Sequence, residues 1–512
     1  MNLTEFAKGR VQIPFPLQAD AYTIAGECLA SPQAKKQSTY NLTNRRSPAE
    51  AWPDVAQDSR MVFFGLTHFI RNHLTQHITH EQIDQTIKFM QTAHSFGGQL
   101  NFDPKPWRRV VNEFQGYMPI QIVALPEGST FFPNEPVIQV FSLDEGFGEM
   151  AAHIEAVMLG MVSIATARAT LGRHWLEQIR NYVRRDVGHD KDIVDQTARF
   201  MIHDFGMRAS STSEESELLG LAHLLVFHGT DTFNAAYLAR QLGAEPPTGT
   251  SILALAHRIV QGWDTEHCAF FNQYCASQKS NKVASYVADC YNFDKAVNRL
   301  AEMADKDRTT IVARPDSGDY VQNVLDILNS SDKIRYIQGD SMTPTKINNL
   351  MNHLLDEGFP ATQRGIFGVG GYLRNTPNRD SLSSAYKLSA VSGLNPKVKL
   401  SEIEEKASIP GPNILTREHC SIYSPTTFMT YEADAQGKDA QVVYYDGNMV
   451  SKECFGDVCL EPFSDIQSRC INDFDKWESV AKRQPNLGLG KFNLFSTEVK
   501  RIRKETFNKY RN

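Results

Sequence analysis

The feature of this 512-residue sequence that most constrains its fold is a repeated unit, in which a short apolar run ends in a polar motif that usually contains glycine. From about residue 175 onward these runs are RFMIHDFG, HLLVFHGTD, KVASYVADCY, TTIVARPDSG, IRYIQGDS, RGIFGVGG and AYKLSAV. Helical patterns such as YNFDKAVNRLAEMA and PTKINNLMNHLLDEG lie between several of them. Strands that alternate with helices indicate a parallel sheet with crossover helices. Seven candidate strands favour a complete or irregular α/β barrel, whose functional side chains gather at the carboxyl ends of the strands.

The rest of the chain predicts a second domain, because single cores stop growing at roughly 250–300 residues. Residues 117–141 alternate like short strands, and residues 30–60 are polar and predict a loop. The tail from about residue 400 holds hairpin-like segments such as QVVYYDGNMVSKECF, with Asp-Gly as the turn. We predict a barrel domain over residues 176–389 and a mixed α/β domain built from both chain ends, residues 1–175 and 390–512.

Composition and charge exclude several classes of protein. With 41% hydrophobic and 22% charged residues, the sequence is typical of a folded globular chain. A net charge of -6 predicts no general affinity for nucleic acid. The amino terminus lacks a signal-peptide pattern, and no apolar run reaches the roughly 18 residues of a membrane helix. The 8 cysteines form no C-x-x-C pair, so we expect reduced thiols and a cytoplasmic protein that binds no membrane.

Two motifs after neighbouring strands predict contacts to a sugar phosphate. Arg314 and Asp316 of ARPDSG combine an anion-binding guanidinium with a carboxylate suited to sugar hydroxyls or a hydrated cation. Gly339 and Asp340 of IQGD allow close backbone approach and acceptance from ribose hydroxyls. The alternatives are an ordinary turn with a solvated ion pair at the first motif and a helix cap at the second.

Further motifs add an anion site and an aromatic face. Gly370 and Gly371 lie in a glycine cluster that can form a backbone nest for phosphate, with Arg379 downstream. The cluster does not match a nucleotide P-loop, and a flexible turn is the alternative. In HDFGMR, Phe205 offers an aromatic face and Arg208 another anion contact, although a core Phe and a surface Arg would look the same.

Four more polar residues complete the predicted rim. Asp231 of HGTDTF is a carboxylate at a strand end, placed to accept a hydrogen bond from a neutral amide. Ser251 and His257 lie in a loop-to-helix segment, where a lone His is usually structural. Asp289 follows the strand SYVA. Arginines, acids and a glycine nest together suit a phosphorylated sugar with a divalent cation, whereas neither a glycosidase carboxylate pair nor a G-x-S-x-G elbow stands out.

At this point the sequence resembles the nicotinamide phosphoribosyltransferase family, in its bacterial form. HDFGMR, HGTDTF, Ser251 with His257, ARPDSG, IQGD and FGVGG with Arg379 occur in the family's order, and ADAY and VFFGL near the amino terminus also match. The resemblance implies a type II phosphoribosyltransferase fold, an irregular α/β barrel with a second α/β domain, assembled as a homodimer. It also implies the transfer of phosphoribose from phosphoribosyl pyrophosphate to nicotinamide, with magnesium, giving nicotinamide mononucleotide and pyrophosphate in NAD salvage.

The resemblance also implies a role for each matching residue. Catalytic roles fall to His257, Arg314 and Asp316, and His257 matches the histidine that the family phosphorylates with ATP. Phe205 and a partner subunit's counterpart of Tyr22 would sandwich the pyridine ring. Arg208 would contact pyrophosphate, and Gly339 and Asp340 would contact the ribose. Gly370, Gly371 and Arg379 would bind the 5′-phosphate. Further substrate contacts would come from Asp231, Ser251, Ser285 and Asp289. Asp289 and Asp316 would hold magnesium through water.

Asp231 carries the prediction of substrate specificity. A hydrogen bond from the neutral carboxamide of nicotinamide to an ionised acceptor contributes roughly 1.5–3 kcal/mol. Nicotinate would instead bring a second carboxylate against Asp231, and buried like charges cost several kcal/mol. An ionised Asp231 close to the ring substituent therefore favours nicotinamide.

Some positions and alternatives stay open. HDFG continues with Met207 where the family usually has Tyr. The arginine that clamps phosphate from the amino-terminal loop is either Arg45 or Arg46, and the corresponding lysine is Lys387. A nicotinate phosphoribosyltransferase is the nearest alternative, and a quinolinate enzyme would need more cations at the ring pocket. The alternative from another class of protein is a non-catalytic binding homologue, and the intact motif residues argue against it.

Overall fold

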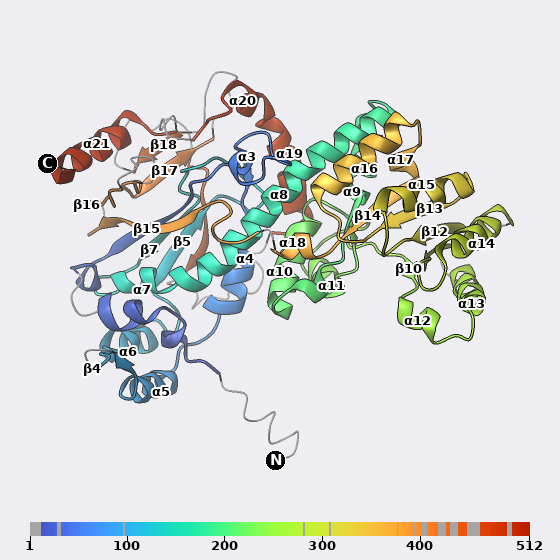
Figure 1. The fold of residues 1–512 in the computed structure, drawn as a ribbon. Helices are drawn as coiled ribbons and strands as arrows, with labels where there is room; N and C mark the ends of the chain where they lie inside the picture. The colour runs from blue at the N-terminus through green and yellow to red at the C-terminus, as the bar shows by residue number, and fades with distance from the viewer. Residues whose placement is uncertain are drawn as a thin grey trace, which may run out of the picture.

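The computed structural model describes most of the chain in two halves, each built on one large sheet (Figure 1). The described residues are 12–27, 32–95, 98–279, 282–306, 309–375, 377–392, 395–401, 407–417, 426–430, 439–447, 461–488 and 494–511. Within this part of the chain, none of the helices is both long enough and apolar enough to span a bilayer.

One half is a curled, seven-stranded parallel sheet that forms a half-barrel, which confirms the irregular α/β barrel that the repeated unit predicts. Its strands run in the order β10–β11–β12–β13–β14–β8–β9. Their bounds are β8 Ile202–Asp204, β9 Gly229–Thr230, β10 Leu253–Ala254, β11 Val283–Val287, β12 Thr310–Arg314, β13 Arg335–Gln338 and β14 Gly365–Val369. All six pairings are parallel, so the carboxyl ends of the strands meet on one edge.

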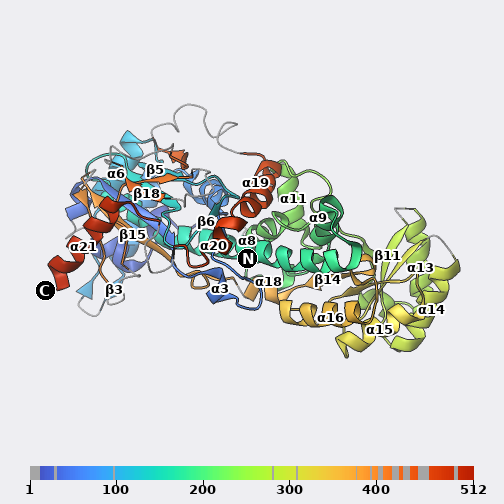
Figure 2. The same ribbon diagram turned by 90° about the horizontal axis from the view of Figure 1, so that it is seen from above.

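Amphipathic helices cover this sheet, as the view from above shows (Figure 2). In α14, Phe293–Lys306, the buried residues Ala296, Val297, Leu300, Ala301 and Ala304 follow the spacing of one helical face. The other helices of this half are α9 Lys191–Phe200, η5 Met207–Ala209, α10 Ser213–Leu224, α11 Phe233–Gln241, α12 His257–Gln261, α13 Glu266–Gln278, α15 Tyr320–Ser330, α16 Pro344–Asp356, α17 Ala361–Arg364 and α18 Gly371–Asn375.

Two of the seven predicted strands were wrong in type or place. The run HLLVF lies at the end of α10 and in the turn after it, and only Gly229–Thr230 forms strand β9. A fully buried apolar run has no periodicity that separates helix from strand. The run AYKLSAV forms β15, Ser384–Val391, which pairs antiparallel with β1 in the other sheet. The seventh parallel strand is β10, in a segment that the sequence suggested was loop and helix.

The second half is built on a six-stranded antiparallel sheet in the order β16–β15–β1–β7–β5–β19. Its central strand β1, Ser38–Asn44, lies within residues 30–60, which were expected to form a loop. The strand is polar in sequence but buried at every position, because polar neighbours pair with it: the Asn41 amide donates to Asn413 Oδ1 at 2.7 Å. The other strands of the sheet are β5 Ile120–Ala124, β7 Ile138–Ser142, β16 Asn395–Pro396 and β19 Val442–Asp446.

Smaller elements surround this sheet. The residues after β19 that would complete the predicted hairpin lie outside the described residues. The two-stranded sheets pair β2 Met61–Val62 with β6 Thr130–Phe131, β3 His94–Ser95 with β4 Gly98–Gln99, and β17 Asn413–Thr416 with β18 Thr426–Met429. The helices are η1 Phe15–Leu17, η2 Thr23–Glu27, η3 Pro32–Lys35, α3 Pro48–Ala51, α4 Leu66–Phe69, η4 Ile70–Leu74, α5 His80–Met90, α6 Pro104–Glu113, α7 Gly148–His153, α19 Phe463–Lys476, α20 Glu478–Arg483 and α21 Thr497–Arg511.

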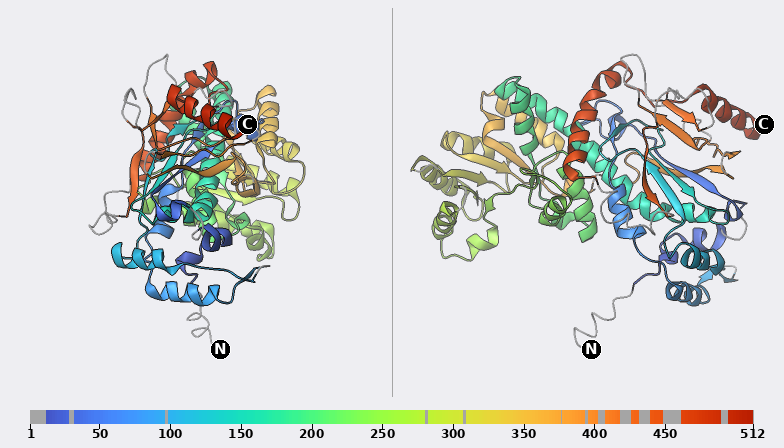
Figure 3. Two further views of the ribbon diagram at one scale, coloured as in Figure 1. Left: turned by 90° about the vertical axis from the view of Figure 1, so that its left-hand side faces the viewer. Right: turned by 180° about the vertical axis from the view of Figure 1, so that it is seen from behind.

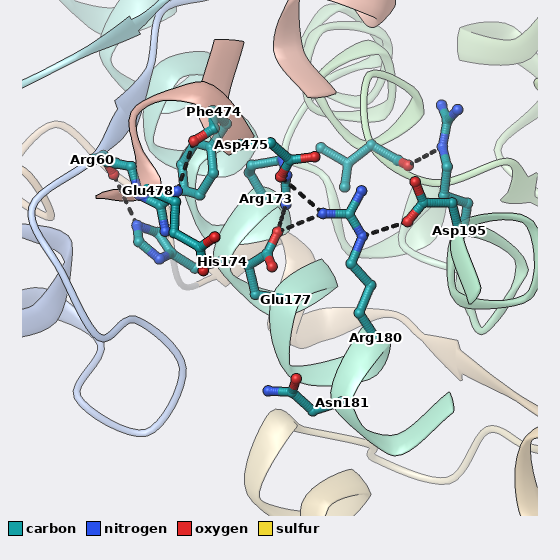
Figure 4. Close-up of polar contacts among 12 residues, drawn as sticks. Arg60, Arg173, His174, Glu177, Arg180, Asn181, Asp195, Phe474, Asp475 and Glu478 are labelled. Atoms are coloured by element: carbon teal, nitrogen blue, oxygen red, sulfur yellow. Dashed lines mark hydrogen bonds and ion pairs between the residues drawn. The ribbon is translucent and has the colours of Figure 1, made fainter. Parts of the chain in front are cut away.

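Helix α8, Glu155–Val187, runs between the two halves and continues through residue 175, where the sequence suggested a domain boundary (Figure 1). A network of charged side chains fixes it to the carboxyl-terminal helix α19 (Figure 4). Arg173 pairs with both Glu177 and Asp475, and Arg180 donates to the same two carboxylates at 2.7 and 2.9 Å. Both guanidinium groups are almost fully buried. Arg180 also pairs with Asp195 of α9 at 2.7 Å, so three helices meet in one network.

The Glu177 carboxylate is expected to stabilise the protein in a pH-dependent way. Burial opposes its ionisation, but the charges of Arg173 and Arg180 lower its pKa to about 2, from an ordinary value of 4.5. A carboxylate with a lowered pKa in the folded state stabilises fully above its unfolded pKa, and loses that contribution as the pH falls toward the folded pKa. We expect Glu177→Gln to reduce the free energy of unfolding by about 2 kcal/mol at neutral pH, and the difference from wild type to shrink between pH 4.5 and pH 2.

Urea unfolding at several pH values measures this effect. Glu505→Gln is the matched control, since Glu505 pairs with Arg501 on the exposed face of α21. Such surface pairs contribute roughly 0–1 kcal/mol. A Glu177→Gln effect that is no larger than the control, or that does not depend on pH, contradicts the assignment.

Candidate active site

A pocket of about 700 Å³ opens at the carboxyl edge of the parallel sheet. It is lined by Phe205, Met207, Arg208, Asp231, Thr232, Arg314, Asp316, Gly339 and Gly370. The sequence analysis had singled out seven of these nine residues. They come from the ends of β8, β9, β12, β13 and β14, which are separated in sequence but adjacent in the sheet.

The register of the sheet explains why these side chains meet. Val369 pairs with Asp204, and Asp204 pairs with Thr230, as the last rungs of three neighbouring strands. The next residues along the chain are therefore Gly370, Phe205 and Asp231, which leave the sheet side by side. Loops at this edge of a parallel sheet hold the binding sites of most α/β enzymes.

The Phe205 ring packs against two glycines, and a side chain at Gly368 would collide with it. Its backbone N–H donates to the Val369 carbonyl at 2.9 Å. A Cβ added to Gly368 would lie 2.1 Å from the ring, and one added to Gly339 would lie 3.6 Å from it. The glycines of FGVGG and IQGD thus leave room for an aromatic side chain at the pocket, in addition to any role in approaching phosphate. The sequence analysis assigned them only the second role.

Asp231 stands beside the aromatic ring and already accepts one hydrogen bond. The Ser251 hydroxyl donates to its Oδ1 at 2.5 Å, a contact that the sequence did not predict. Burial raises the pKa of Asp231, while the Ser251 hydrogen bond and the charge of Arg314 oppose that rise. Its second oxygen is available to a donor on a ligand bound against Phe205.

His257, Asp289 and Asp316 form a polar cluster at the next strand ends. His257 Nε2 lies 3.0 Å from Asp289 Oδ1, and its Nδ1 lies 3.9 Å from Asp316 Oδ2. The Ser317 hydroxyl donates to the other oxygen of Asp289 at 2.5 Å. Asp289 is thereby held from two sides and fixes the orientation of the imidazole. His257 begins α12 and remains 39% exposed, so its ring can meet a ligand.

Two cations complete the pocket. The Arg314 guanidinium donates to the Leu255 carbonyl at 3.1 Å and lies 3.8 Å from Asp316. Its buried Nε has no hydrogen-bond partner among the described residues, and such a donor favours an anionic ligand. Arg208, in η5 directly after Phe205, is exposed on the pocket wall.

Ser285 and Asp340 occupy positions next to this cluster. Ser285 lies within β11, opposite Ala254 and Val312, and its buried hydroxyl oxygen has no partner among the described residues. Asp340 follows β13, and its backbone N–H donates to Gln338 Oε1 at 3.0 Å, which forms a turn. No capping bond from the Asp340 side chain to α16 occurs, because Thr343 caps that helix.

Five further residues named in the sequence analysis do not line this pocket: Tyr22, Arg45, Arg46, Arg379 and Lys387. Tyr22 precedes η2, which packs on α7, and is 62% exposed. Arg379 lies between α18 and β15. The burial of Arg45 and the positive charge of Arg379 both lower the pKa of Arg45. Arg46 instead donates to the Glu50 carbonyl, and Lys387 lies 3.4 Å from Glu155. Of the two arginines, Arg45 is thus the one on which the charge of Arg379 acts.

Sequence reasoning missed the residues that hold the pocket walls together. Thr232 lines the pocket, and its hydroxyl donates to the Asp204 carbonyl at 3.5 Å. Asp204 and Arg374 form an ion pair at 2.7 Å with both side chains fully buried. Asp204 belongs to the motif HDFGMR and Arg374 lies just after the glycine cluster, but nothing in the sequence signals that they pair across 170 residues.

The carboxylates of the cluster fit a hydrated cation better than a protein-made metal cage. Among the described residues, no group of three or more His, Cys, Asp or Glu side chains is arranged to hold a metal ion. Both oxygens of Asp289 are engaged, whereas Asp316 is one-third exposed. Magnesium usually keeps several waters and binds through one or two carboxylates with substrate phosphates, which suits this arrangement.

Comparisons with known proteins agree with this geometry. A sequence profile described as the nicotinate phosphoribosyltransferase (NAPRTase) family matches residues 200–409, and one described as the nicotinamide phosphoribosyltransferase N-terminal domain matches residues 15–122. Together they span both halves of the fold.

Individual relatives carry the same names. The chain is 29% identical to a nicotinamide phosphoribosyltransferase of Xanthomonas campestris, over 64% of this chain and 73% of the relative. It is 24% identical to a nicotinamide phosphoribosyltransferase of Acinetobacter baylyi, over the same shares. The crystal structure of human nicotinic acid phosphoribosyltransferase shares the fold with a TM-score of 0.59 at 15% identity, covering 96% of this chain and 100% of that one. The chain is therefore similar, in both halves of its fold, to nicotinate and nicotinamide phosphoribosyltransferases, which are pentosyltransferases.

Proposed function

We propose that the protein transfers the phosphoribosyl group of phosphoribosyl pyrophosphate to nicotinamide, producing nicotinamide mononucleotide and pyrophosphate for NAD salvage. The observation that carries this choice is Asp231, a carboxylate that shares one pocket with the Phe205 ring and with Arg314 and Asp316. The bacterial relatives named nicotinamide phosphoribosyltransferase support it. We further propose that the reaction takes place in the cytoplasm, which the described free thiols Cys268, Cys275, Cys290 and Cys470 support.

The pocket residues have different roles in this reaction. Phe205 stacks on the pyridine ring and aims its nitrogen at the anomeric carbon, which acquires oxocarbenium character as pyrophosphate leaves. Arg208 and Arg314 stabilise the charge that develops on the departing pyrophosphate. The pyridine nitrogen carries no proton to remove, so the mechanism needs no general base.

The remaining contacts position the sugar phosphate and its metal. Asp316, Gly339 and Asp340 contact the ribose, and Gly370 and Gly371 contact the 5′-phosphate. We propose that Asp289 and Asp316 hold magnesium through water. When bound, magnesium supplies positive charge to the pyrophosphate oxygens.

Asp231 selects the amide because of its charge. One of its oxygens accepts from Ser251, so the other is free to accept a carboxamide N–H. This hydrogen bond is worth roughly 1.5–3 kcal/mol when the acceptor is ionised. Nicotinate would place its own carboxylate against Asp231, which costs several kcal/mol in a desolvated site.

Replacing Asp231 by Asn is expected to lower the preference for nicotinamide over nicotinate, measured as the ratio of kcat/KM values, by at least about tenfold. Because burial raises the pKa of Asp231, the wild-type preference is also expected to fall as the assay is made more acidic and the carboxyl becomes protonated. Asp319→Asn is the control, since Asp319 caps α15 outside the pocket. An unchanged ratio in the Asp231→Asn enzyme contradicts this role and favours a nicotinate phosphoribosyltransferase.

We also propose that ATP phosphorylates His257 and thereby enhances catalysis. Asp289 engages Nε2 at 3.0 Å, whereas Nδ1 lies 3.9 Å from Asp316, beyond hydrogen-bond distance, so Nδ1 is the nitrogen that accepts the phosphoryl group. The added charge would change the contacts of the pyrophosphate site. Acid-labile phosphate from γ-labelled ATP should appear in wild type, disappear in His257→Ala, and persist in His267→Ala, a change of an exposed histidine on α13. Equal labelling of both variants contradicts the assignment.

The proposed homodimer follows from the position of Tyr22. The amino-terminal residues lie on the half with the six-stranded sheet, away from the parallel sheet that carries Phe205 (Figure 3). One chain therefore supplies only one face of the aromatic sandwich, and we propose that a second copy supplies the other through its own Tyr22. Exposed Phe233 and Tyr237 on α11, close to the pocket wall, support an apolar contact there.

Subunit mixing tests this arrangement. Tyr22→Ala and Arg314→Ala should each lose most activity as purified homodimers. In a dimer of one copy of each, one of the two sites regains both residues, so random mixing is expected to restore about a quarter of wild-type activity. Mixing that forms dimers of both variants without restoring activity contradicts a site shared between subunits.

A further inference from the structure

The ion pair between Asp204 and Arg374 lies directly beneath the pocket, and the proposed chemistry does not use it. Both side chains are fully buried, and Arg374 Nη2 donates to Asp204 Oδ2 at 2.7 Å. Taking two charges out of water is costly, and a buried pair is weak evidence for stability alone. What each partner contacts therefore indicates its role.

Asp204 connects two loops of the pocket. Its Oδ1 accepts from the Gly206 N–H at 2.8 Å, which closes the turn that presents Phe205. Its carbonyl accepts from the Asp231 N–H at 2.9 Å, so the amide-binding carboxylate leaves the sheet against the same residue. One residue thus anchors the chain on both sides of the predicted pyridine site.

Arg374 connects a third loop to these two. It lies on α18, which begins at Gly371 in the glycine cluster. Besides Asp204, its Nε donates to the Ser210 hydroxyl at 2.8 Å, directly after the turn that carries Arg208. A Cβ on Gly206 would lie 2.8 Å from the Arg374 guanidinium carbon, so the two loops are in close contact. The guanidinium therefore joins the phosphate loop to the loop of Phe205 and Arg208.

A second buried contact supports the same residues from α8. Arg168 Nη2 lies 2.7 Å from His223 Nδ1, and His223 Nε2 lies 2.9 Å from the Gly229 carbonyl in β9. Burial and the charge of Arg168 lower the pKa of His223 to about 3, so the imidazole is neutral and donates through Nε2 to β9. The strand that leads to Asp231 is thereby fixed to the helix that runs between both halves.

We propose that the Asp204–Arg374 ion pair is a positioning element, which keeps the Phe205 loop, the Asp231 loop and the glycine loop at the mutual distance that the two substrates require. Neither residue is catalytic, since both lie below the pocket floor. A displacement of about 1 Å between substrate-binding groups can cost roughly a hundredfold in rate, so a fixed spacing has value here. The proposal deepens the proposed function and, in its kinetic part, rests on it.

The test separates positioning from stability by removing both charges together. Asp204→Asn and Arg374→Met singly leave a buried unpaired charge, and each is expected to lower Tm. The double variant leaves neither charge of the pair, so its Tm should recover toward wild type. Its binding should not recover: the Kd for inorganic pyrophosphate, measured by calorimetry, and the KM for both substrates are expected to stay raised by about tenfold or more.

Pyrophosphate binding keeps this test independent of the proposed reaction. If wild type does not turn over nicotinamide, the proposed function fails, but the calorimetric comparison still decides the role of the pair. A double variant that regains both Tm and wild-type affinity shows a merely structural pair and overturns the proposal. Wild-type affinity in a folded single variant overturns it as well.

Two further variants complete the design. Glu135→Gln with Arg417→Met makes the same change at a buried ion pair, 2.6 Å long, on the other half of the molecule. It should shift Tm and leave the pyrophosphate Kd unchanged. If the Asp204→Asn/Arg374→Met protein does not fold, Arg374→Lys keeps the charge but loses the fork that also reaches Ser210. That variant is expected to weaken pyrophosphate binding severalfold, and an unchanged Kd would overturn the proposal.

Discussion

The parallel register of the curled sheet is the constraint on which the site depends. Because neighbouring parallel strands end on one edge, Phe205, Asp231 and Gly370 leave the sheet from adjacent rungs although they span more than 160 residues of sequence. No single loop holds enough groups to bind a pyridine, a ribose and a pyrophosphate. The sheet gathers an aromatic face, a carboxylate and a glycine loop at one place, and each loop needs only a few residues.

The two buried ionic clusters of this molecule have different roles. The network of Arg173, Glu177, Arg180 and Asp475 ties α8 to α19 (Figure 4), and none of its members lines the pocket. The pair beneath the pocket instead joins substrate loops to one another. Desolvation makes any buried charge costly, so the presence of a buried ion pair does not reveal its role. The groups that the pair contacts show whether it connects parts of the fold or positions the loops of a site.

Much of the site could be predicted from the sequence because its residues lie in local motifs. Arg314 and Asp316 follow an apolar run that does form a strand, whereas Asp231 follows the two-residue strand β9 and not the apolar run HLLVF. The placement of strands was harder. Strand β1 was missed because its polar side chains are satisfied by distant partners such as Asn413, and HLLVF was misassigned because a buried run carries no periodic signal.

Long-range pairings lie beyond sequence reasoning altogether. The link between Asp204 and Arg374 spans 170 residues, and that between Arg173 and Asp475 spans 302. Both depend on how helices pack, which no local motif specifies. The structure also shows that the charge of Arg379 acts on Arg45, which no local motif indicates.

The central claim is that a carboxylate at position 231 makes the uncharged pyridine amide the substrate. The most direct measurement is the steady-state kcat/KM of the purified protein with nicotinamide and with nicotinate, at saturating phosphoribosyl pyrophosphate and magnesium, at neutral pH. The account predicts a ratio of at least about a hundred in favour of nicotinamide, the sum of a gained hydrogen bond and an avoided charge repulsion. Equal rates, or a preference for nicotinate, would contradict it.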